Sequence, residues 1–219
     1  LSMLLSARDE ETGEGMTEEQ LRTEVTTFLL AGQETTSLAL TWTWYLLSEH
    51  AAAQRRLEEE IDNFLGDRPP EYADLVNMPY LRMVIGEALR LYPPAWGFSR
   101  QALADDELGG FHLPRGWLAF VIPYVLHRLP AFWEEPEAFD PERWNSADSK
   151  STKRVSMPFG AGPRLCPGRY LAILEMKMVM AMLLSEFDIV EVGTPDGGEA
   201  REHLAFTMHP VGLSLKLRS

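Results

Sequence analysis

The chain has 219 residues, 45% hydrophobic and 24% charged, which is the composition of an ordinary soluble globular protein. Its formal net charge of −13 argues against nucleic acid or an anionic membrane as the main partner. The single cysteine excludes an internal disulfide framework and zinc clusters, and no run of about eighteen apolar residues predicts a membrane span. We therefore expect a soluble, cytoplasmic protein.

Residues 17–50 carry a long helical pattern. Thr17 and Gln20 have the spacing of a capping box at its start. In its middle lies the run AGQETT, where threonine hydroxyls bonding to carbonyls one turn earlier predict a local bend. The acid and the threonine, Glu34 and Thr35, have two interpretations: a buried polar pair that satisfies the bent helix, or a proton relay.

Two shorter helices are predicted at 51–65 and at 79–92. The glutamates at 58–60 are interpreted as a solvated face of the first. On the second, Glu87 and Arg90 are three residues apart and therefore share one face. From spacing alone they are a surface pair worth a few tenths of a kcal/mol.

The segment after the second helix is extended by composition. Trp96 and Phe98 alternate with small residues, so one face lines either a strand core or a pocket. Alternating residues on both sides of the turn at 114–116 predict a small sheet. His127 is interpreted as structural, because no second ligand lies at metal-site spacing.

The only cysteine, Cys166, lies in the run FGAGPRLCPGR. A lone cysteine is usually a small buried apolar residue. Here Pro167, a good first helical residue, predicts a helix N-terminus whose partial positive charge favours the thiolate. Gly160 and Gly162 permit positive φ and close approach of a flat ligand, and Arg164 can pair with an acidic group on it. A thiolate beneath a planar tetrapyrrole needs these parts.

A further helix is predicted after Gly168, up to about Glu186. Its apolar, methionine-rich face is interpreted as core and consists of Leu171, Leu174, Met178 and Met182. The tail predicts strands at 187–189 and 204–208, with a glycine-rich turn between them.

The cysteine run matches the pattern Phe-x-x-Gly-x-Arg-x-Cys-x-Gly and fails as a dinucleotide fingerprint, because Leu165 stands where a third glycine belongs. It resembles the haem-ligand loop of the cytochrome P450 family of haem-thiolate monooxygenases. The AGQETT run resembles the oxygen-activation motif of the same family. The matched positions of the loop are Phe159, Gly162, Arg164, Cys166 and Gly168.

This resemblance implies a mainly α fold with small β-sheets, the α+β cytochrome P450 fold. Members of the family are much longer than this chain. The resemblance covers nearly all of this chain. Residues 1–219 are therefore expected to form the C-terminal, haem-proximal part of a single domain, from the oxygen-activation helix onward. The N-terminal half, absent from this sequence, would hold any membrane anchor.

The resemblance also implies residue roles around haem b, the iron protoporphyrin. Cys166 would bind the iron, and Arg164 and Arg100 would pair with propionates. The loop that carries the sulfur would be shaped by Phe159, Gly162 and Gly168.

On the opposite side of the haem, Ala31 and Gly32 would leave room for dioxygen. There Glu34 and Thr35 would deliver protons as the catalytic pair.

Two further sets of residues follow from the resemblance. Glu87 and Arg90 would be buried with Arg143 of the segment Pro-Glu-Arg-Trp and would support the cysteine loop. The substrate pocket would be lined by Trp96, Phe98 and Phe206.

The implied activity is a monooxygenase reaction on an apolar organic substrate, with electrons from NAD(P)H through a partner. An acidic donor, whether a ferredoxin, a flavodoxin or a flavin reductase domain, would dock on a basic cluster near the cysteine. Its members are Lys150, Lys153, Arg154, Arg164, Arg169 and Lys177, with Glu175 as the one acid among them.

Two alternatives stay open from the sequence. One is a haem-thiolate peroxygenase or isomerase that needs no electron donor. The other is an incomplete fragment that binds no haem and has no activity. Fatty acids, terpenes and aromatic compounds all remain possible substrates.

Overall fold

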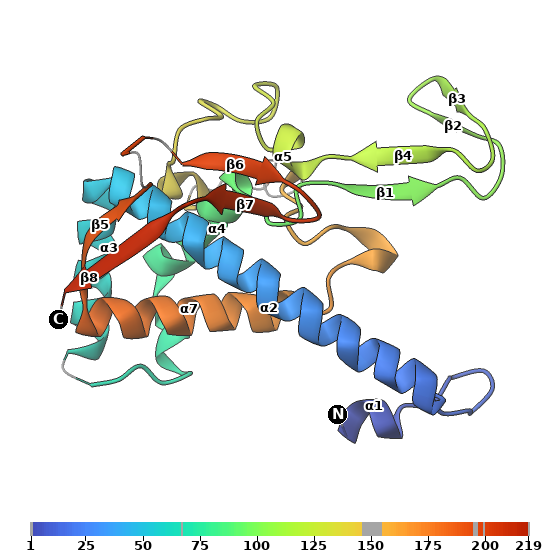
Figure 1. Cartoon of the computed structure of the whole chain (residues 1–219), viewed down its shortest axis with the longest axis horizontal. Helices are drawn as coiled ribbons and strands as arrows, with labels where there is room; N and C mark the ends of the chain where they lie inside the picture. The colour runs from blue at the N-terminus through green and yellow to red at the C-terminus, as the bar shows by residue number, and fades with distance from the viewer. Residues whose placement is uncertain (1, 67, 146–154, 195–196, 199, 219) are drawn as a thin grey trace.

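The computed structural model describes residues 2–66, 68–145, 155–194, 197–198 and 200–218. Helices dominate, and small pairs of strands lie around them (Figure 1). The α-helices are α1 (Ser2–Ser6), α2 (Glu18–Glu49), α3 (Ala51–Leu65), α4 (Pro79–Leu91), α5 (Pro123–Leu126) and α7 (Arg169–Glu186). Short 3-10 turns are η1 (Asp74–Asn77), η2 (Pro141–Trp144) and η3 (Gly162–Arg164). This architecture confirms the predicted α+β class.

The strands form antiparallel pairs: β1 with β4, β2 with β3, β5 with β8 and β6 with β7. Their bounds are β1 (Phe98–Gln101), β2 (Asp106–Leu108), β3 (Phe111–Leu113), β4 (Leu118–Val121), β5 (Asp188–Gly193), β6 (Arg201–Leu204), β7 (Met208–Val211) and β8 (Ser214–Arg218). The strands on either side of the turn at 114–116 do not pair with each other. Each pairs with an earlier strand, and together they form one long ribbon (Figure 1).

Helix α2 is continuous over 32 residues. It begins with the predicted capping box: the Gln20 amide donates to the Thr17 hydroxyl at 3.2 Å, and the Thr17 amide donates to the Gln20 side chain at 2.8 Å. The predicted bend produces no break in the helix, which continues through Gly32. The Thr35 hydroxyl does donate to the Ala31 carbonyl, at 2.6 Å, as expected.

The core lies where the C-terminal half of α2 meets α3, α4 and α7. Leu47, Leu57, Leu81 and Met180 are fully buried there, and each such side chain contributes about 1.5–3 kcal/mol through removal of apolar surface from water. The N-terminal half of α2 runs away from this core towards α1 (Figure 1). It leaves large apolar side chains exposed, namely Val25, Phe28, Leu29 and Leu30.

Helix α7 buries a different face from the predicted one. Its buried residues include Met176 and Met180, whereas Leu171 and Met182 are exposed. Leu174 and Met178 are partly buried against the core. The prediction was wrong because methionine and leucine occur all round this helix, so apolar spacing does not select one face.

The glutamates at 58–60 are not simply a solvated face. Glu60 accepts hydrogen bonds from the amides of Tyr80 and Leu81, both at 2.8 Å. These amides belong to the first turn of α4, where backbone donors have no partner within the helix. The carboxylate of Glu60 therefore caps α4 from the neighbouring helix.

The predicted strand at 204–208 was also wrong in part. Only Leu204 and Met208 lie in strands, β6 and β7, and the three residues between them form the turn of a hairpin. The Ala205 amide closes this turn by donating to the Thr207 carbonyl at 3.1 Å. The hairpin is fixed to α2, because the buried Trp42 indole donates to the Met208 carbonyl at 3.1 Å.

None of the helices in the described part of the chain combines the length and hydrophobicity that a bilayer span requires.

Candidate functional site

Cys166 lies in a folded-back loop just before α7. Its amide donates to the Phe159 carbonyl at 3.0 Å, which closes the loop into a compact turn. Gly160 and Gly162 have φ of 74° and 70°, the left-handed conformation that the sequence predicted. Cys166 is a free, partly buried thiol.

The sulfur lies near a helix N-terminus as predicted, but Pro167 is not the first helical residue. Helix α7 begins at Arg169 with Gly168 as its N-cap, so Pro167 precedes the helix instead of starting it. A Cβ placed on Gly168 would lie 3.9 Å from the Cys166 sulfur, which is ordinary contact. The cysteine therefore stands two residues before the N-cap, on the loop side of the helix end.

The two arginines predicted to bind propionates are exposed. Arg164 ends the short turn η3 and forms no hydrogen bond or ion pair with any described residue. Arg100 lies on β1, donates to its neighbouring Ser99 carbonyl at 2.8 Å and covers the Phe98 ring. Neither cation has a carboxylate partner in the described part of the chain.

The residues of the AGQETT run face outward from α2. Ala31, Gly32 and Glu34 are exposed, and Thr35 is partly buried. A Cβ placed on Gly32 would meet nothing within 4 Å, so this turn of the helix is open. These residues leave an open surface on the helix, with a hydroxyl and a carboxylate beside it.

Glu34 has partners that the sequence analysis missed. Its Oε1 accepts from the Thr207 hydroxyl at 2.8 Å and lies 3.3 Å from His209 Nε2. Both partners come from the β6–β7 hairpin, 173 residues away for Thr207, so no local pattern could reveal them.

The predicted support residues form a closed polar network. Glu87 and Arg90 on α4 are fully buried and make two hydrogen bonds, at 2.8 and 2.9 Å. Arg143 from η2 donates to Glu87 at 2.8 Å, as the resemblance implied, and the Trp144 indole donates to it at 2.9 Å. The pair is therefore not the exposed pair that spacing alone suggested.

Arg90 also reaches a segment with little regular structure. Besides Glu87, its guanidinium donates to the carbonyls of His127, Pro136 and Ala138 at 2.6–2.9 Å. All five of its N–H groups are thereby used, which is the full capacity of a guanidinium.

His127 connects this network to the cysteine loop. The Met157 amide donates to its Nε2 at 2.9 Å, so Nδ1 carries the hydrogen and donates to the Arg90 carbonyl at 3.0 Å. Burial lowers the pKa of His127 to about 4, so the ring is neutral at pH 7. His127 thus has the structural role that was predicted for it, and it contacts the loop at Met157, two residues before Phe159.

The segments predicted to line the substrate pocket come together. The Trp96 indole donates to the Ala205 carbonyl at 2.8 Å, and the Met208 amide donates to the Pro94 carbonyl at 3.0 Å. Phe206, at the tip of the hairpin, is 94% exposed. Trp96 and Phe98 are partly buried.

The basic cluster near the cysteine is only partly visible. Lys150, Lys153 and Arg154 lie outside the described residues. Lys177 does not belong to an exposed patch, because its ammonium donates to the Leu75 carbonyl at 2.8 Å. Burial lowers its pKa as well.

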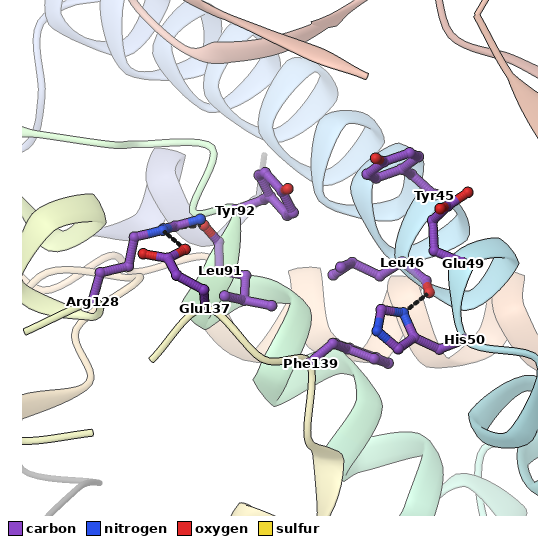
Figure 2. Close-up of a pocket in the computed structure, with 9 residues that line it drawn as sticks. All are labelled: Tyr45, Leu46, Glu49, His50, Leu91, Tyr92, Arg128, Glu137 and Phe139. Atoms are coloured by element: carbon purple, nitrogen blue, oxygen red, sulfur yellow. Dashed lines mark hydrogen bonds and ion pairs between the residues drawn. The ribbon is translucent and has the colours of Figure 1, made fainter. Parts of the chain in front are cut away.

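A pocket of about 200 Å³ lies away from these residues (Figure 2). It is formed by the C-terminal ends of α2 and α4 and the segment after α5, with Tyr45, His50, Tyr92 and Arg128 among its lining residues. Tyr45 is eleven residues beyond Glu34, or about 16 Å along the helix axis. This pocket therefore contains none of the predicted site residues.

The donor set of the site suits haem. The site has one free thiol, a glycine-bearing loop and two exposed arginines that have no carboxylate partner among the described residues. These match a thiolate ligand and two propionate contacts. Among the described residues there is no group of three or more His, Cys, Asp or Glu that could hold a metal ion, so a multi-ligand metal centre has no support there.

Comparison with known proteins identifies the family of the chain. The family model described as Cytochrome P450 matches residues 1–217. Cyclooctatin synthase of Streptomyces melanosporofaciens is 44% identical over 184 residues, which are 84% of this chain and 40% of that protein. Cyclooctat-9-en-7-ol 5-monooxygenase of the same organism is 40% identical, over 85% of this chain and 41% of that protein.

A solved structure gives the same result. The crystal structure of the cytochrome P450DA heme domain has a TM-score of 0.89 and 33% sequence identity, and the match covers 99% of this chain and 48% of that one. The chain spans about two fifths of the length of the curated relatives it matches. Because a family model covers residues 1–217 and the fold follows that of a heme domain throughout, this chain belongs to the cytochrome P450 family.

Proposed function

We propose that this chain is the haem-proximal part of a haem-thiolate monooxygenase that oxidises an apolar organic molecule. The observation that carries the proposal is the partly buried free thiol of Cys166, held in a loop with two left-handed glycines. The activity of the whole protein rests on family membership together with this loop.

We infer further that residues 1–219 are the C-terminal part of a single domain. Two facts support this: the relatives are more than twice as long as the part matched, and large apolar side chains on α2 are exposed. Further chain packed on α2 would cover them.

Within this proposal, Cys166 would hold the iron of haem b, and Arg164 and Arg100 would pair with its propionates. Phe159 would support the loop, with Gly162 and Gly168 keeping its surface free of side chains. Bound haem supplies the dioxygen chemistry, which an electron-rich thiolate ligand favours.

On the side of the haem opposite to Cys166, the chain's own residues would deliver protons. Glu34 would hold a proton at its carboxylate, and Thr35 would pass it on from its hydroxyl. Since that hydroxyl donates to the Ala31 carbonyl at 2.6 Å, Thr35 must turn its hydrogen away from the helix to donate elsewhere. Ala31 and Gly32 have small side chains or none and would leave space beside the helix for dioxygen.

The substrate is proposed to be apolar, because Trp96, Phe98 and Phe206 are the side chains that the two adjoining segments present. The name of one relative, cyclooctat-9-en-7-ol 5-monooxygenase, supports testing a cyclic alkenol first. Fatty acids and aromatic compounds are the comparison substrates.

Electrons would come from NAD(P)H through an acidic ferredoxin, flavodoxin or flavin reductase domain. With Arg164 assigned to a propionate, Arg169 remains as a partly exposed cation near the cysteine loop. Attraction between such cations and an acidic donor speeds association most at low ionic strength. Reduction of the haem should therefore slow as salt is added.

The decisive experiment is the absorption spectrum of the reduced, carbon monoxide-bound protein. A strongly red-shifted Soret band is expected, and Cys166→Ser should abolish it. Met157→Leu, in the same loop, should retain the band. An imidazole-like band in the unchanged protein would refute thiolate ligation and the proposed function with it.

The proton pair is tested by neighbouring substitutions. Thr35→Ala should divert electrons from product to hydrogen peroxide, whereas Thr36→Ala, one residue on, should leave the product yield per electron unchanged. Turnover with added hydrogen peroxide but none with dioxygen and a donor would instead support the peroxygenase.

A further inference from the structure

The β6–β7 hairpin places a histidine and a hydroxyl against the carboxylate of the proposed proton pair. Thr207 is 2% exposed and contacts both Glu34, at 2.8 Å, and His209, at 2.9 Å. The His209 Nε2 is 3.3 Å from the same Glu34 oxygen. Three polar groups from two distant parts of the chain therefore share one hydrogen-bonded cluster.

The contacts determine which way the hydrogens point. The Thr207 hydroxyl has one hydrogen, and it donates to the Glu34 carboxylate, which only accepts. The Thr207 oxygen must then accept from His209 Nε2. His209 accordingly carries a hydrogen on Nε2, directed towards both Thr207 and Glu34.

The cluster is held in place and reaches water. The buried Trp42 indole binds the Met208 carbonyl, between Thr207 and His209, and Trp42 lies eight residues after Glu34 on the same helix. The His209 side chain is 36% exposed, so its ring joins solvent to the buried hydroxyl. The other titratable ring nearby, His203 on β6, pairs with His209 across the hairpin, with ring centroids 6.4 Å apart.

We propose that His209 and Thr207 form the next step of the proton relay: they pass protons from solvent to Glu34. A proton taken from solvent on His209 Nδ1 allows release of the Nε2 proton to the Glu34 carboxylate, directly or through the Thr207 hydroxyl. Each such transfer leaves His209 neutral with its hydrogen on Nδ1, and proton exchange with solvent restores the Nε2 form. This role rests on the proposed function of Glu34 and Thr35.

The first test examines the hydrogens directly. In the purified, reduced, carbon monoxide-bound protein, ¹⁵N spectroscopy should show His209 with hydrogen on Nε2, its signals identified by their loss in His209→Gln. Thr207→Val should remove this tautomer preference, and Thr207→Ser should keep it. A bare Nε2 with hydrogen on Nδ1 in the unchanged protein would overturn the proposed direction of transfer.

The second test separates a relay from a structural role. His209→Gln keeps a hydrogen-bond donor but cannot pass a proton on. Product formed per electron from dioxygen and donor should fall about tenfold, less than the 10²–10⁴-fold typical of a primary acid, because water can partly replace the ring. Turnover driven by hydrogen peroxide, which brings its own protons, should stay within about twofold.

His203→Gln is the matched control on the facing strand and should behave as the unchanged protein. If the thiolate band is present and His209→Gln matches His203→Gln in both assays, the relay is wrong and the proposed function survives. A protein without the thiolate band overturns both. Equal losses with dioxygen and with peroxide would show a merely structural role and overturn the relay.

Discussion

The polar networks around Glu87 and around Glu34 use similar groups in opposite surroundings. Glu87 and Arg90 are fully buried, and every guanidinium N–H has an acceptor. The side chains of Glu34 and His209 are 47% and 36% exposed; they lie 3.3 Å apart and both contact Thr207. A saturated buried network holds structure in place, whereas a half-exposed one can exchange protons with water. The difference supports our proposal that the first network holds structure and that the second transfers protons.

The largest expected effect tests the buried side of this comparison. Glu87→Gln removes the charge that compensates Arg90 and should lower the free energy of unfolding by about 3–5 kcal/mol. Urea unfolding measures this loss. Glu59→Gln, an exposed glutamate on α3, is the control and should change the unfolding free energy by less than about 0.5 kcal/mol. Similar losses in both variants would remove the distinction between the two networks.

A second prediction uses the buried ring attached to Arg90. The pKa of His127 is about 4 in the folded protein, against an ordinary value of 6.5. Between these pH values the unfolded chain binds a proton that the folded chain does not, so stability falls as pH drops from 6.5 to 4. The loss is roughly 3 kcal/mol and levels off below pH 4.

Unfolding midpoints measured between pH 7 and pH 4 check this linkage. His127→Gln should flatten the pH dependence, whatever it does to stability at pH 7. His112→Gln, on the exposed strand β3, should leave the slope as it is. A slope unaffected by His127→Gln would mean that the buried network is open to water.

A smaller effect is expected at the start of α4, the helix that carries Glu87 and Arg90. Glu60→Gln weakens the two hydrogen bonds to the Tyr80 and Leu81 amides and the attraction to the helix N-terminus. We expect a loss of about 1 kcal/mol in the free energy of unfolding, measured by urea titration. Glu59→Gln again serves as the neighbour without such contacts, and an equal response from both would contradict the cap.

The smallest effect is expected at the exposed network. Glu34→Gln should change the free energy of unfolding by less than about 1 kcal/mol, because a partly exposed pair contributes little to stability. A double-mutant cycle with His209→Gln should give a coupling energy within the same limit. A coupling of several kcal/mol would place Glu34 with the support residues instead.

Local signals explain what could be predicted from the sequence. The capping pair Thr17 and Gln20, Pro79 at the first position of α4 and Gly66 after α3 each act within a few residues. The cysteine loop was predictable for the same reason, since its glycines must adopt positive φ. The start of α7 after Gly168 was predicted correctly, whereas Pro167 belongs to the loop and not to the first helical turn.

Contacts between distant segments explain what could not be predicted. Glu60 and Lys177 are ordinary surface residues by sequence. Only the packing of α3 against α4 and of α7 against η1 gives them backbone partners. The hydroxyl and the ring that contact Glu34 come from the far end of the chain. A strand was expected at 204–208, yet residues 205–207 form the turn of the β6–β7 hairpin.

The long-range hydrogen bonds of Arg90 have a consequence for how the chain folds. Its three carbonyl acceptors lie 37, 46 and 48 residues further along the chain, in a stretch with little helix or strand of its own. We therefore expect that stretch to reach its final path only after α4 has formed and placed the guanidinium. During synthesis and refolding the stretch should therefore become ordered after α4, at the step in which the Arg90 side chain binds its carbonyls.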